Sequence, residues 1–485
     1  MNNMPYVLTI DFGTSGCRSA IYNENLDMLC VSVEEYPLIV HSEAEIEQDA
    51  NIWWEKAKAT IKNVVSSSGI NVKEIRSLSI SSQGIAFVPI DRQGNTLSNA
   101  ISWLDTRAQS ETEEIEARYG MPEIYQRTGK RISGVYSLPK LIWFKNNCTE
   151  IYNAAWKILL PLDYIQFKLS GRCVTDHTMA GGTMFYNVQT QQWDTEILDT
   201  YGLDVQKLPE IAWAGTTIGT ISPDVAEELG LCKELVIVNG AQDQKCAALG
   251  AGASQEVAAI SLGTGTCLAQ ISSSPRPDTK MRVPFFSYVR EGQWDLEGVI
   301  NTAGSAYSWF QRELGGQQSF DVLDAEAAGV HLPNSVLFYP YLSGVSSPHW
   351  GEGTGTFTGL SLSSTTGHMA RAVMEGIAYN IRENLDAMGE VCGKAKEIRL
   401  YGGGSKSLLW CQIIADITNI PVTRLCSSET ALAGAAILAY APLKVPVPFS
   451  LDCADVIKPQ SDMVNMYNEA YQHYEQTRQK YFNSL

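Results

Sequence analysis

The sequence lacks any cluster of basic side chains. Its 36 Lys and Arg residues are outnumbered by 53 Asp and Glu residues, and the formal net charge is −17 at pH 7. This excess of negative charge argues against nucleic acid and anionic membrane surfaces as the main partners. It does not argue against ATP, which requires only local hydrogen-bond donors and a cation. We therefore predict small-molecule ligands, with no nucleic acid or membrane partner.

Long apolar runs and paired cysteines are also missing. No apolar stretch reaches the roughly 18 residues that span a membrane, and the N-terminal segment lacks the basic region of a secretion signal. The eleven cysteines form no C-x-x-C pair, and the six histidines are isolated. These patterns argue against a disulfide framework, a structural zinc site and a His-rich metal site. They predict a cytoplasmic protein with reduced thiols.

The chain does have length and apolar content. At 485 residues with 45% hydrophobic side chains, it can form two large domains with full cores. The first half of the chain shows a succession of strands, Gly-rich turns and helices, and the same succession is repeated from about residue 235. We therefore predict an N-terminal domain over residues 1–245 and a C-terminal domain over residues 246–485, with no flexible linker.

Short β-prone runs alternate with amphipathic helical patterns in both halves. In the first half the patterns predict an antiparallel hairpin over residues 6–23, helices over 51–69, 110–120 and 138–148, and a strand over 75–82. In the second half they predict a buried strand over 235–243 that ends at an acid, a strand–turn–strand unit over 256–273, a helix over 367–389, and a strand, turn and helix over 397–419. This alternation predicts mixed α/β sheets with covered faces.

Two similar glycine-rich turns lie about half the chain length apart. Residues 9–16 are TIDFGTSG and residues 260–266 are ISLGTGT. Such turns offer unobstructed backbone N–H groups and small hydroxyls, which phosphate oxygens require. Either turn alone fits an ordinary hairpin equally well, but two turns in equivalent places favour phosphate binding. A duplicated α/β domain could place them face to face across a cleft, where they would bind one ligand from both sides.

Better-known nucleotide motifs are absent. No G-K-[ST] follows either turn, so neither is a Walker loop. GGGSKS at residues 402–407 lacks the G-x-G-x-x-G spacing of a dinucleotide fingerprint. It follows a predicted strand and precedes a helix, where it could contact the sugar or base of a nucleotide.

Two carboxylates end predicted strands. Asp11, just before the first turn, is placed to hold Mg²⁺ beside bound phosphates. Asp243, near the domain junction, could take a proton from a substrate hydroxyl during phosphoryl transfer. Each is also compatible with an ordinary turn or cap residue, so the interpretation depends on the surrounding motifs.

At these residues the sequence resembles the FGGY carbohydrate kinases, the family of glycerol kinase and xylulokinase, nearly from end to end. DFGTSGCR and SLGTGT resemble the two phosphate loops, and GAQDQKCAALG resembles the segment with the catalytic aspartate. GTFTGLSLSSTTGHMARAVMEG fits the C-terminal signature, whereas YSLPKLIWFKNN fits the N-terminal one with Val135 in place of the usual Gly, Ser or aromatic residue. GGGSKSLLWCQIIADI and ETALAGAAILA resemble the adenosine-site segment and the closing helix.

The resemblance implies an α/β fold of two ribonuclease-H-like, actin-like ATPase domains around a central cleft, which close on MgATP and a ketose or polyol. It implies that Asp11 is the acid at the Mg²⁺ site and that Asp243 is the base for the hydroxyl that receives phosphate. The implied nucleotide contacts are Gly13, Thr14, Ser15 and Arg18 in the first half, and Gly263, Thr264, Gly403, Gly404 and Ser407 in the second. A homodimer is a possible assembly.

The acceptor is less defined. Xylulokinases usually have Gln-Met-His where this chain has Gln83, Gly84 and Ile85. Without this histidine the chain lacks a hydrogen-bond donor that would orient a polyol. Gly84 and Ile85 also make this wall of the predicted acceptor pocket roomier and more apolar. Several other segments favour xylulokinase, so D-xylulose is the leading prediction, with glycerol, ribulose, gluconate or another polyol as alternatives.

Four further side chains are candidates for binding the acceptor, each with a structural alternative. Trp103 could stack on the sugar or lie in the core, and Asp105 could accept sugar hydroxyls or pair with Arg107. Gln83 and Gln244 could bind hydroxyls or be satisfied polar core residues. One rival function is an actin-like ATPase that drives a protein partner. Another is a catalytically idle sugar sensor, and the two retained carboxylates, Asp11 and Asp243, disfavour this second rival.

Overall fold

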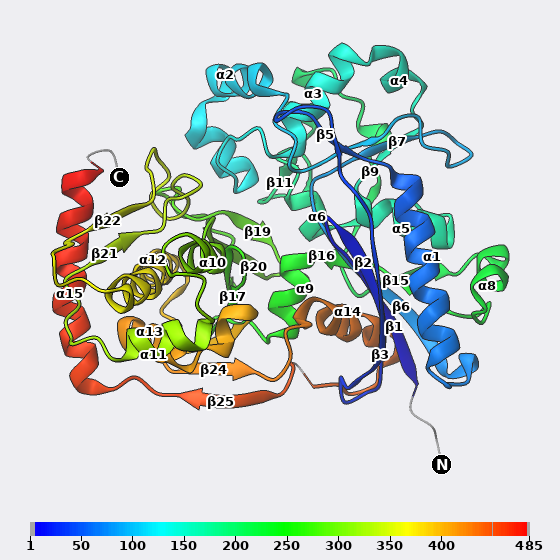
Figure 1. Cartoon of the computed structure of the whole chain (residues 1–485). Coiled ribbons are helices and arrows are strands. Elements are labelled where there is room, and N and C mark those ends of the chain that lie inside the picture. The colour runs from blue at the N-terminus through cyan, green and yellow to red at the C-terminus, as the bar shows by residue number, and fades with distance from the viewer. Residues whose placement is uncertain (1–4, 449, 483–485) are drawn as a thin grey trace. The chain divides into compact units, whose positions relative to one another are not determined.

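The computed structural model describes residues 5–448 and 450–482. The contacts within the chain define two compact units (Figure 1). The first comprises Met1–Gly250, Phe285–Trp294 and Glu429–Leu451, and the second comprises Ala251–Pro284, Asp295–Ser428 and Asp452–Leu485. Each unit is built around its own mixed sheet, as expected for an α/β protein. The predicted domain boundary near residue 245 falls inside a helix of the first unit, and the segment 429–451 packs with that unit although it follows most of the second.

The first unit has a sheet in the order β14-β15-β6-β1-β2-β3. Its strands are β14 (Thr217–Thr220), β15 (Val236–Val238), β6 (Ile75–Ser82), β1 (Tyr6–Phe12), β2 (Gly16–Tyr22) and β3 (Met28–Glu35), and β16 (Ala241–Gln242) also pairs with β6. β1, β2 and β3 are successively antiparallel, whereas β6 runs parallel to β1, β15 and β16. The predicted hairpin over residues 6–23 and the strand over 75–82 are confirmed.

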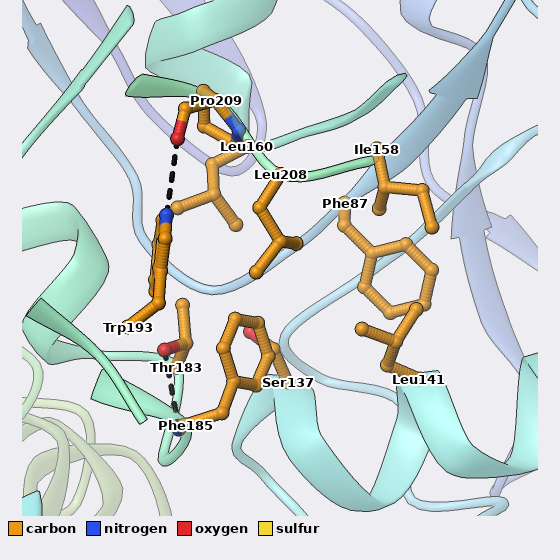
Figure 2. A pocket seen from close by; sticks show the side chains of 10 residues that line it. All are labelled: Phe87, Ser137, Leu141, Ile158, Leu160, Thr183, Phe185, Trp193, Leu208 and Pro209. Atoms are coloured by element: carbon orange, nitrogen blue, oxygen red, sulfur yellow. Dashed lines mark hydrogen bonds between the residues drawn. The ribbon is translucent and has the colours of Figure 1, made fainter. Parts of the chain in front are cut away.

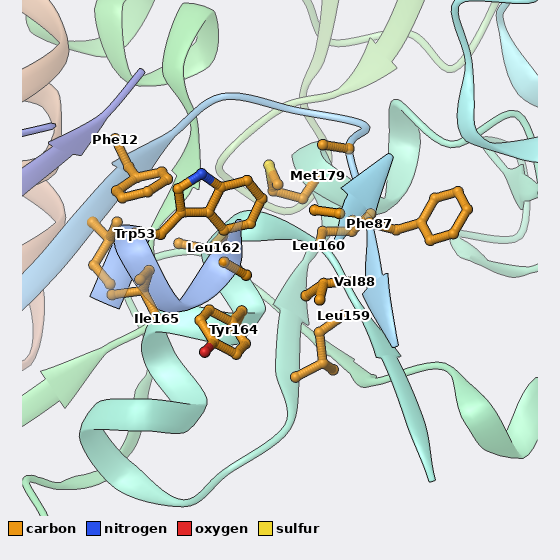
Figure 3. Packing of buried hydrophobic residues seen from close by; sticks show 14 of the residues in the cluster. Phe12, Trp53, Phe87, Val88, Leu159, Leu160, Leu162, Tyr164, Ile165 and Met179 are labelled. Carbon is orange, nitrogen blue, oxygen red and sulfur yellow. The ribbon is translucent and has the colours of Figure 1, made fainter. Parts of the chain in front are cut away.

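Helices cover this sheet because their apolar faces match its buried side chains. α1 (Ala50–Ser67), predicted from its periodicity, packs on β2 and β3, while α14 (Thr430–Tyr440) packs on β1, β6 and α9 (Asp243–Gly250). Phe12 meets Trp53 of α1 edge to face, with ring centroids 5.5 Å apart, and Trp53 in turn contacts Tyr164 (Figure 3). This cluster fixes the end of β1, where the first glycine-rich turn begins.

The remaining elements of the first unit form smaller sheets and helices around the main sheet. The helices are α2 (Gln109–Thr128), α3 (Ser137–Asn147), α4 (Thr149–Ala154), α5 (Pro161–Ser170), α6 (His177–Gly181), α7 (Thr195–Thr200) and α8 (Pro223–Leu229). The strands of these smaller sheets are β4 (Ile39–Val40), β5 (Ile46–Gln48), β7 (Val88–Ile90), β8 (Ala100–Ile101), β9 (Lys157–Leu159), β10 (Val174–Asp176), β11 (Tyr186–Asn187), β12 (Gln192–Trp193) and β13 (Glu210–Ala212). The strand β19 (Phe285–Ser287) also falls among the residues of the first unit but is not part of these smaller sheets.

One predicted element is wrong. The sequence predicts a continuous strand over residues 235–243, but β15 stops at Val238, the chain resumes pairing only in the two-residue β16, and Asp243 begins α9. The break occurs because the N–H of Gly240 donates to Gln166 Oε1 (3.0 Å) in place of a ladder partner. A Cβ on Gly240 would lie 1.9 Å from the carbonyl oxygen of Ile80, so glycine is required at this close approach.

The second unit repeats the arrangement with strands in the order β20-β18-β17-β23-β24-β25. These are β20 (Trp294–Ile300), β18 (Thr266–Ser272), β17 (Val257–Leu262), β23 (Glu397–Tyr401), β24 (Val422–Leu425) and β25 (Cys453–Ile457). β17 is antiparallel to β18 and parallel to β23, just as β1 is antiparallel to β2 and parallel to β6. The predicted internal repeat is therefore present in the strand topology.

Helices and a short sheet complete the second unit. They are α10 (Gly304–Glu313), α11 (Phe320–Ala328), α12 (Thr366–Cys392), α13 (Leu408–Thr418), α15 (Ser461–Tyr481), β21 (Leu337–Tyr339) and β22 (Thr356–Thr358). The predicted helix over residues 367–389 and the strand–turn–helix unit over 397–419 are confirmed. In the described part of the chain, every helix is too short or too polar to span a bilayer.

Candidate functional site

The first glycine-rich turn, residues 13–16, connects β1 to β2. It is closed by a hydrogen bond from the N–H of Gly13 to the carbonyl of Gly16 (2.9 Å). A Cβ on Gly16 would lie 2.6 Å from the carbonyl oxygen of Glu34. Only glycine at position 16 therefore allows the turn to pack this closely against β3. The glycine pattern therefore produces a tight turn at the carboxyl end of β1.

The carbonyl groups of this turn all bond to the protein. Gly13 accepts from the hydroxyl of Tyr36 (2.5 Å), and Ser15 accepts from the backbone N–H of the same residue (3.0 Å). Thr14 accepts from Nε2 of Gln48 (2.7 Å). In a trans peptide the C=O of one residue and the N–H of the following residue point in opposite directions. Because the carbonyls of Gly13 and Thr14 point toward the protein, the N–H groups of Thr14 and Ser15 point away from it. Within the described residues, the N–H groups of Thr14 and Ser15 have no acceptor, which leaves them for a ligand.

The second turn, residues 263–265, connects β17 to β18 in the same manner. Gly263 donates to the carbonyl of Gly265 (3.1 Å), and the carbonyls of Gly263 and Thr264 accept from the start of α10. Gly304 donates to Gly263 (2.8 Å), and both the N–H (3.0 Å) and the hydroxyl (2.7 Å) of Ser305 donate to Thr264. The Thr264 side chain is exposed, and its N–H finds no acceptor in the described part of the chain. Each unit thus presents one turn with outward-facing donors.

Gly304 and Ser305 were not predicted from the sequence as residues of the site. A Cβ on Gly304 would lie 2.4 Å from the carbonyl oxygen of Gly263, so only glycine fits beneath the turn. The sole local signal is a Gly-Ser pair before a helical pattern, and nothing in it indicates contact with a turn about 40 residues earlier.

The two candidate carboxylates lie at the carboxyl edge of one sheet. In the strand register, Asp11 of β1 and Ala241 of β16 both pair with Ser81 of β6, and Asp243 follows two residues later. The pKa of the Cys246 thiol, one turn into α9, is raised chiefly by burial and further by the negative charges of Asp176, Asp11 and Asp243. These carboxylates therefore lie within electrostatic range of the same atom. The structure therefore brings Asp11 and Asp243 into one neighbourhood, and their roles toward a ligand remain predictions.

Asp11 has an environment suited to a partly buried anion. Ser81 donates its hydroxyl hydrogen to Oδ1 of Asp11 (2.7 Å). Burial raises the pKa of Asp11, while the Ser81 hydrogen bond and the positive charge of Arg18 lower it and the charge of Glu429 raises it. Arg18 is opposite Asp11 in the hairpin and forms an ion pair with Glu429 at 3.1 Å, with its side chain about half exposed.

Asp243 is held where α9 begins. Its Oδ1 accepts from Nε2 of Gln242 (2.5 Å) and from the N–H of Gln244 (2.7 Å). The N–H of Gln242 donates to the hydroxyl of Thr178 (2.9 Å), and Asp176 accepts from both the N–H and the hydroxyl of Thr178. Asp176 and Thr178 thus fix the backbone before Asp243. They were missed as site residues because they precede Asp243 by 67 and 65 residues, so no local pattern connects them with it.

The candidate acceptor residues lie beside this edge. Gln83 is buried, and its N–H donates to the carbonyl of Phe12 (2.6 Å). A Cβ on Gly84 would lie 3.2 Å from Cγ of Gln242, so this residue adjoins the segment that holds Asp243. Ile85 has φ of 60°, a left-handed conformation that is rare for a β-branched residue and concentrated at functional sites.

Asp105 is fully buried and paired. Its two oxygens lie 3.0 and 2.9 Å from Nε of Arg107, and Oδ2 also accepts from the N–H of Ile46 (2.7 Å). This is the structural alternative predicted for Asp105. Trp103 is half-buried, and its indole N–H donates to Oγ1 of Thr14 (2.9 Å). Contact of Trp103, Asp105 or Gln244 with an acceptor remains a prediction.

The predicted adenosine segment packs against the second turn. Gly402 has φ of 92°, which favours glycine, and a Cβ on Gly404 would lie 2.5 Å from Cγ of Leu262, the residue before that turn. Gly403 has open space at its Cα. The hydroxyl of Ser407 accepts from the N–H of Trp410 (3.1 Å), so it caps α13. Ser407 therefore positions this segment through its side chain, and a contact with adenosine remains a prediction.

One further cavity offers no comparable chemistry. An apolar cavity in the first unit is lined by Phe87, Ser137, Leu141, Ile158, Leu160, Thr183, Phe185, Trp193, Leu208 and Pro209 (Figure 2). Its polar groups are engaged within the protein, for example the Trp193 indole N–H with the carbonyl of Pro209 (3.0 Å). Over the described ranges, no three His, Cys, Asp or Glu side chains are grouped to hold a metal ion.

Comparison with known proteins agrees with the two-part arrangement. The model of the FGGY family of carbohydrate kinases matches with its N-terminal domain over residues 6–250 and with its C-terminal domain over residues 258–442. The xylulose kinase of Staphylococcus xylosus is 31% identical over 443 residues, which cover 90% of each chain.

Two solved structures from Lactobacillus acidophilus share the fold. Its ligand-bound xylulose kinase is 26% identical with a TM-score of 0.93 and covers 98% of both chains. Its gluconate kinase is 26% identical with a TM-score of 0.93 and covers 99% of this chain and 98% of that one. The predicted two-domain, actin-like ATPase fold is thereby confirmed, and the chain belongs to the FGGY family of carbohydrate kinases.

Proposed function

We propose that this ATP-dependent sugar kinase transfers the γ-phosphoryl group of MgATP to a hydroxyl of a ketose or polyol, with D-xylulose the leading acceptor. The observation that carries the proposal is the construction of the two turns, whose carbonyls are bonded inward and whose N–H groups are left for phosphate oxygens. Family membership favours this function over an actin-like ATPase that drives a protein partner.

Asp243 is the proposed base. It lies partly exposed at the start of α9, at the same sheet edge as Asp11, and its carboxylate is oriented by Gln242 and the N–H of Gln244. A carboxylate in this position can accept the proton of the attacking hydroxyl as the phosphoryl group transfers. The turn amides and the hydroxyls of Thr14 and Thr264 would stabilise the charge of the transferring group.

Mg²⁺ is the proposed metal. It typically binds one or two carboxylates together with phosphate oxygens and water, and it neutralises charge on the transferring phosphoryl group. The oxygen donors at the end of β1 fit that preference, since the Ser81 hydroxyl orients the Asp11 carboxylate. Asp11 would hold the ion, and Arg18 would lie on the phosphate side of the turn.

The acceptor wall supports a ketose or polyol without selecting one. Gly84 and Ile85 provide no hydrogen-bond donor on their side chains, so glycerol, ribulose, gluconate and other polyols remain alternatives to D-xylulose. The gluconate kinase of L. acidophilus has the same fold, which favours keeping gluconate among them. We further propose a cytoplasmic enzyme that binds no nucleic acid or membrane and forms a homodimer.

An ADP-coupled screen over D-xylulose, ribulose, glycerol, erythritol and gluconate tests this proposal. We expect at least one compound to raise ADP release far above the rate without acceptor, and the phosphorylated product to be detected by mass spectrometry. If ADP release is equal with and without every compound in a broad polyol panel, the proposal is wrong.

A further inference from the structure

Both oxygen atoms of Thr14 are bound by side chains from outside the phosphate turn. Nε1 of Trp103 lies 2.9 Å from Oγ1 of Thr14, and Nε2 of Gln48 lies 2.7 Å from its carbonyl oxygen. Gln48 is fully buried at the end of β5, and its Oε1 accepts from Nε2 of Gln83 (3.2 Å). The residues predicted for the acceptor and the turn predicted for phosphate thus form one hydrogen-bonded assembly.

The bond from Trp103 determines the direction of the Thr14 hydroxyl. An indole N–H can only donate, so Oγ1 of Thr14 is the acceptor in this pair and its own hydrogen must point elsewhere. No residue in the described ranges accepts that hydrogen. The hydroxyl is therefore held as a donor beside the two free N–H groups of the turn.

The bond from Gln48 determines the direction of an amide. A peptide carbonyl can only accept, so the amide group of Gln48 presents its nitrogen to Thr14 and its oxygen to Gln83. The Thr14–Ser15 peptide is trans, so fixing the Thr14 carbonyl inward turns the N–H of Ser15 outward. Gln48 thereby sets the second donor of the turn without touching a ligand itself.

The backbone that carries Trp103 is also anchored. The buried ammonium group of Lys140 donates to the carbonyls of Ser102 (2.9 Å), Trp103 (3.4 Å) and Val135 (2.8 Å). The indole is therefore fixed at its backbone and at its N–H, and only the faces of the ring are left for an acceptor.

We propose that Trp103 and Gln48 are positioning residues for the nucleotide, and that they orient the Thr14 hydroxyl and the Ser15 N–H toward phosphate. This inference rests on the proposed function, because it takes the turn to bind ATP. It assigns the polar edge of Trp103 to the nucleotide side, although the sequence predicts that this residue serves the acceptor. A loss of the indole N–H should then weaken the binding of ATP rather than of sugar.

Trp103→Phe tests the inference because it keeps an aromatic ring and deletes only the N–H. Calorimetric titration without acceptor should show that the Kd for MgATP rises about five- to twentyfold, and the KM for the acceptor should change less than twofold. Thr14→Val should weaken MgATP binding at least as much, and the double variant should bind it no more weakly than Thr14→Val alone. Trp193→Phe, which deletes an indole N–H bond to Pro209 in the same unit, is the matched control and should leave the Kd unchanged.

Gln48→Glu supplies a second, independent readout. A carboxyl group facing the Thr14 carbonyl can donate only when protonated, so the ratio of the MgATP Kd of this variant to that of wild type should rise as pH rises from 5 to 8. The inference is overturned if Trp103→Phe raises the acceptor KM but leaves the MgATP Kd within twofold, or if its effect adds fully to that of Thr14→Val. A wild-type protein that binds MgATP yet phosphorylates no polyol would refute the proposed function and leave these binding tests intact.

Discussion

Ser81 donates its hydroxyl hydrogen to the carboxylate of Asp11 across two parallel strands, at a distance of 2.7 Å. The bond favours the charged form of a carboxylate whose pKa is raised chiefly by burial. It therefore links the packing of the first sheet to the charge that the proposed Mg²⁺ site requires.

Ser81→Ala should shift the acid limb of activity. Without the hydroxyl, the pKa of Asp11 rises further, so the carboxylate is protonated at a higher pH and holds Mg²⁺ less well. We expect the MgCl₂ concentration for half-maximal rate to rise about three- to tenfold at acidic pH and much less at alkaline pH. Titrations of Mg²⁺ at several pH values measure this, and identical curves for variant and wild type would contradict the role of Ser81.

Gly304→Ala should impair the second turn. The added Cβ would lie 2.4 Å from the carbonyl oxygen of Gly263, so the turn must move away from α10. We expect the KM for MgATP to rise at least tenfold while the variant remains folded. Gly329→Ala in the same unit is the control, because its Cβ would meet no atom closer than 3.5 Å and its φ is −76°. Equal KM values for the two variants would argue against the proposed role of the second turn.

Lys140 should make stability depend on alkaline pH. Burial lowers its pKa from 10.5 to about 7, an effect that the charge of Asp105 opposes and that of Arg107 reinforces. Because the folded-state pKa lies below the unfolded one, the unfolded chain binds more protons between these values, and the free energy of unfolding rises with pH. Relative to Lys140→Met, wild type should therefore gain up to about 1.4 kcal/mol per pH unit between pH 7 and 9. Urea unfolding of both proteins at pH 7, 8 and 9 tests this, and a constant difference would refute it.

The sequence was sufficient for features set by local chemistry. Both hairpins followed from β-prone runs around Gly-Thr turns, and α1 and α12 followed from their apolar periodicity. Asp11 and Asp243 were predicted as site residues because each ends a predicted strand and because the surrounding motifs resemble a family. The repeat of the two turns also predicted the repeated strand topology.

Features set by distant partners could not be predicted from the sequence. The strand over residues 235–243 breaks because Gln166 of α5 takes the N–H of Gly240. Gly304 contacts a turn far earlier in the chain, and residues 429–451 pack with the first unit although they follow most of the second. Gln48 was not predicted as a site residue, since nothing local indicates that its amide binds Thr14.

The most direct test of the account is the turnover and nucleotide binding of Asp243→Ala, measured together with the best acceptor from the screen. Removing the base should lower kcat by about 10²- to 10⁴-fold, while the Kd for MgATP should remain within about threefold of wild type, since the turn amides are intact. Near-normal phosphorylation by this variant would contradict the assignment of Asp243 and with it the proposed mechanism.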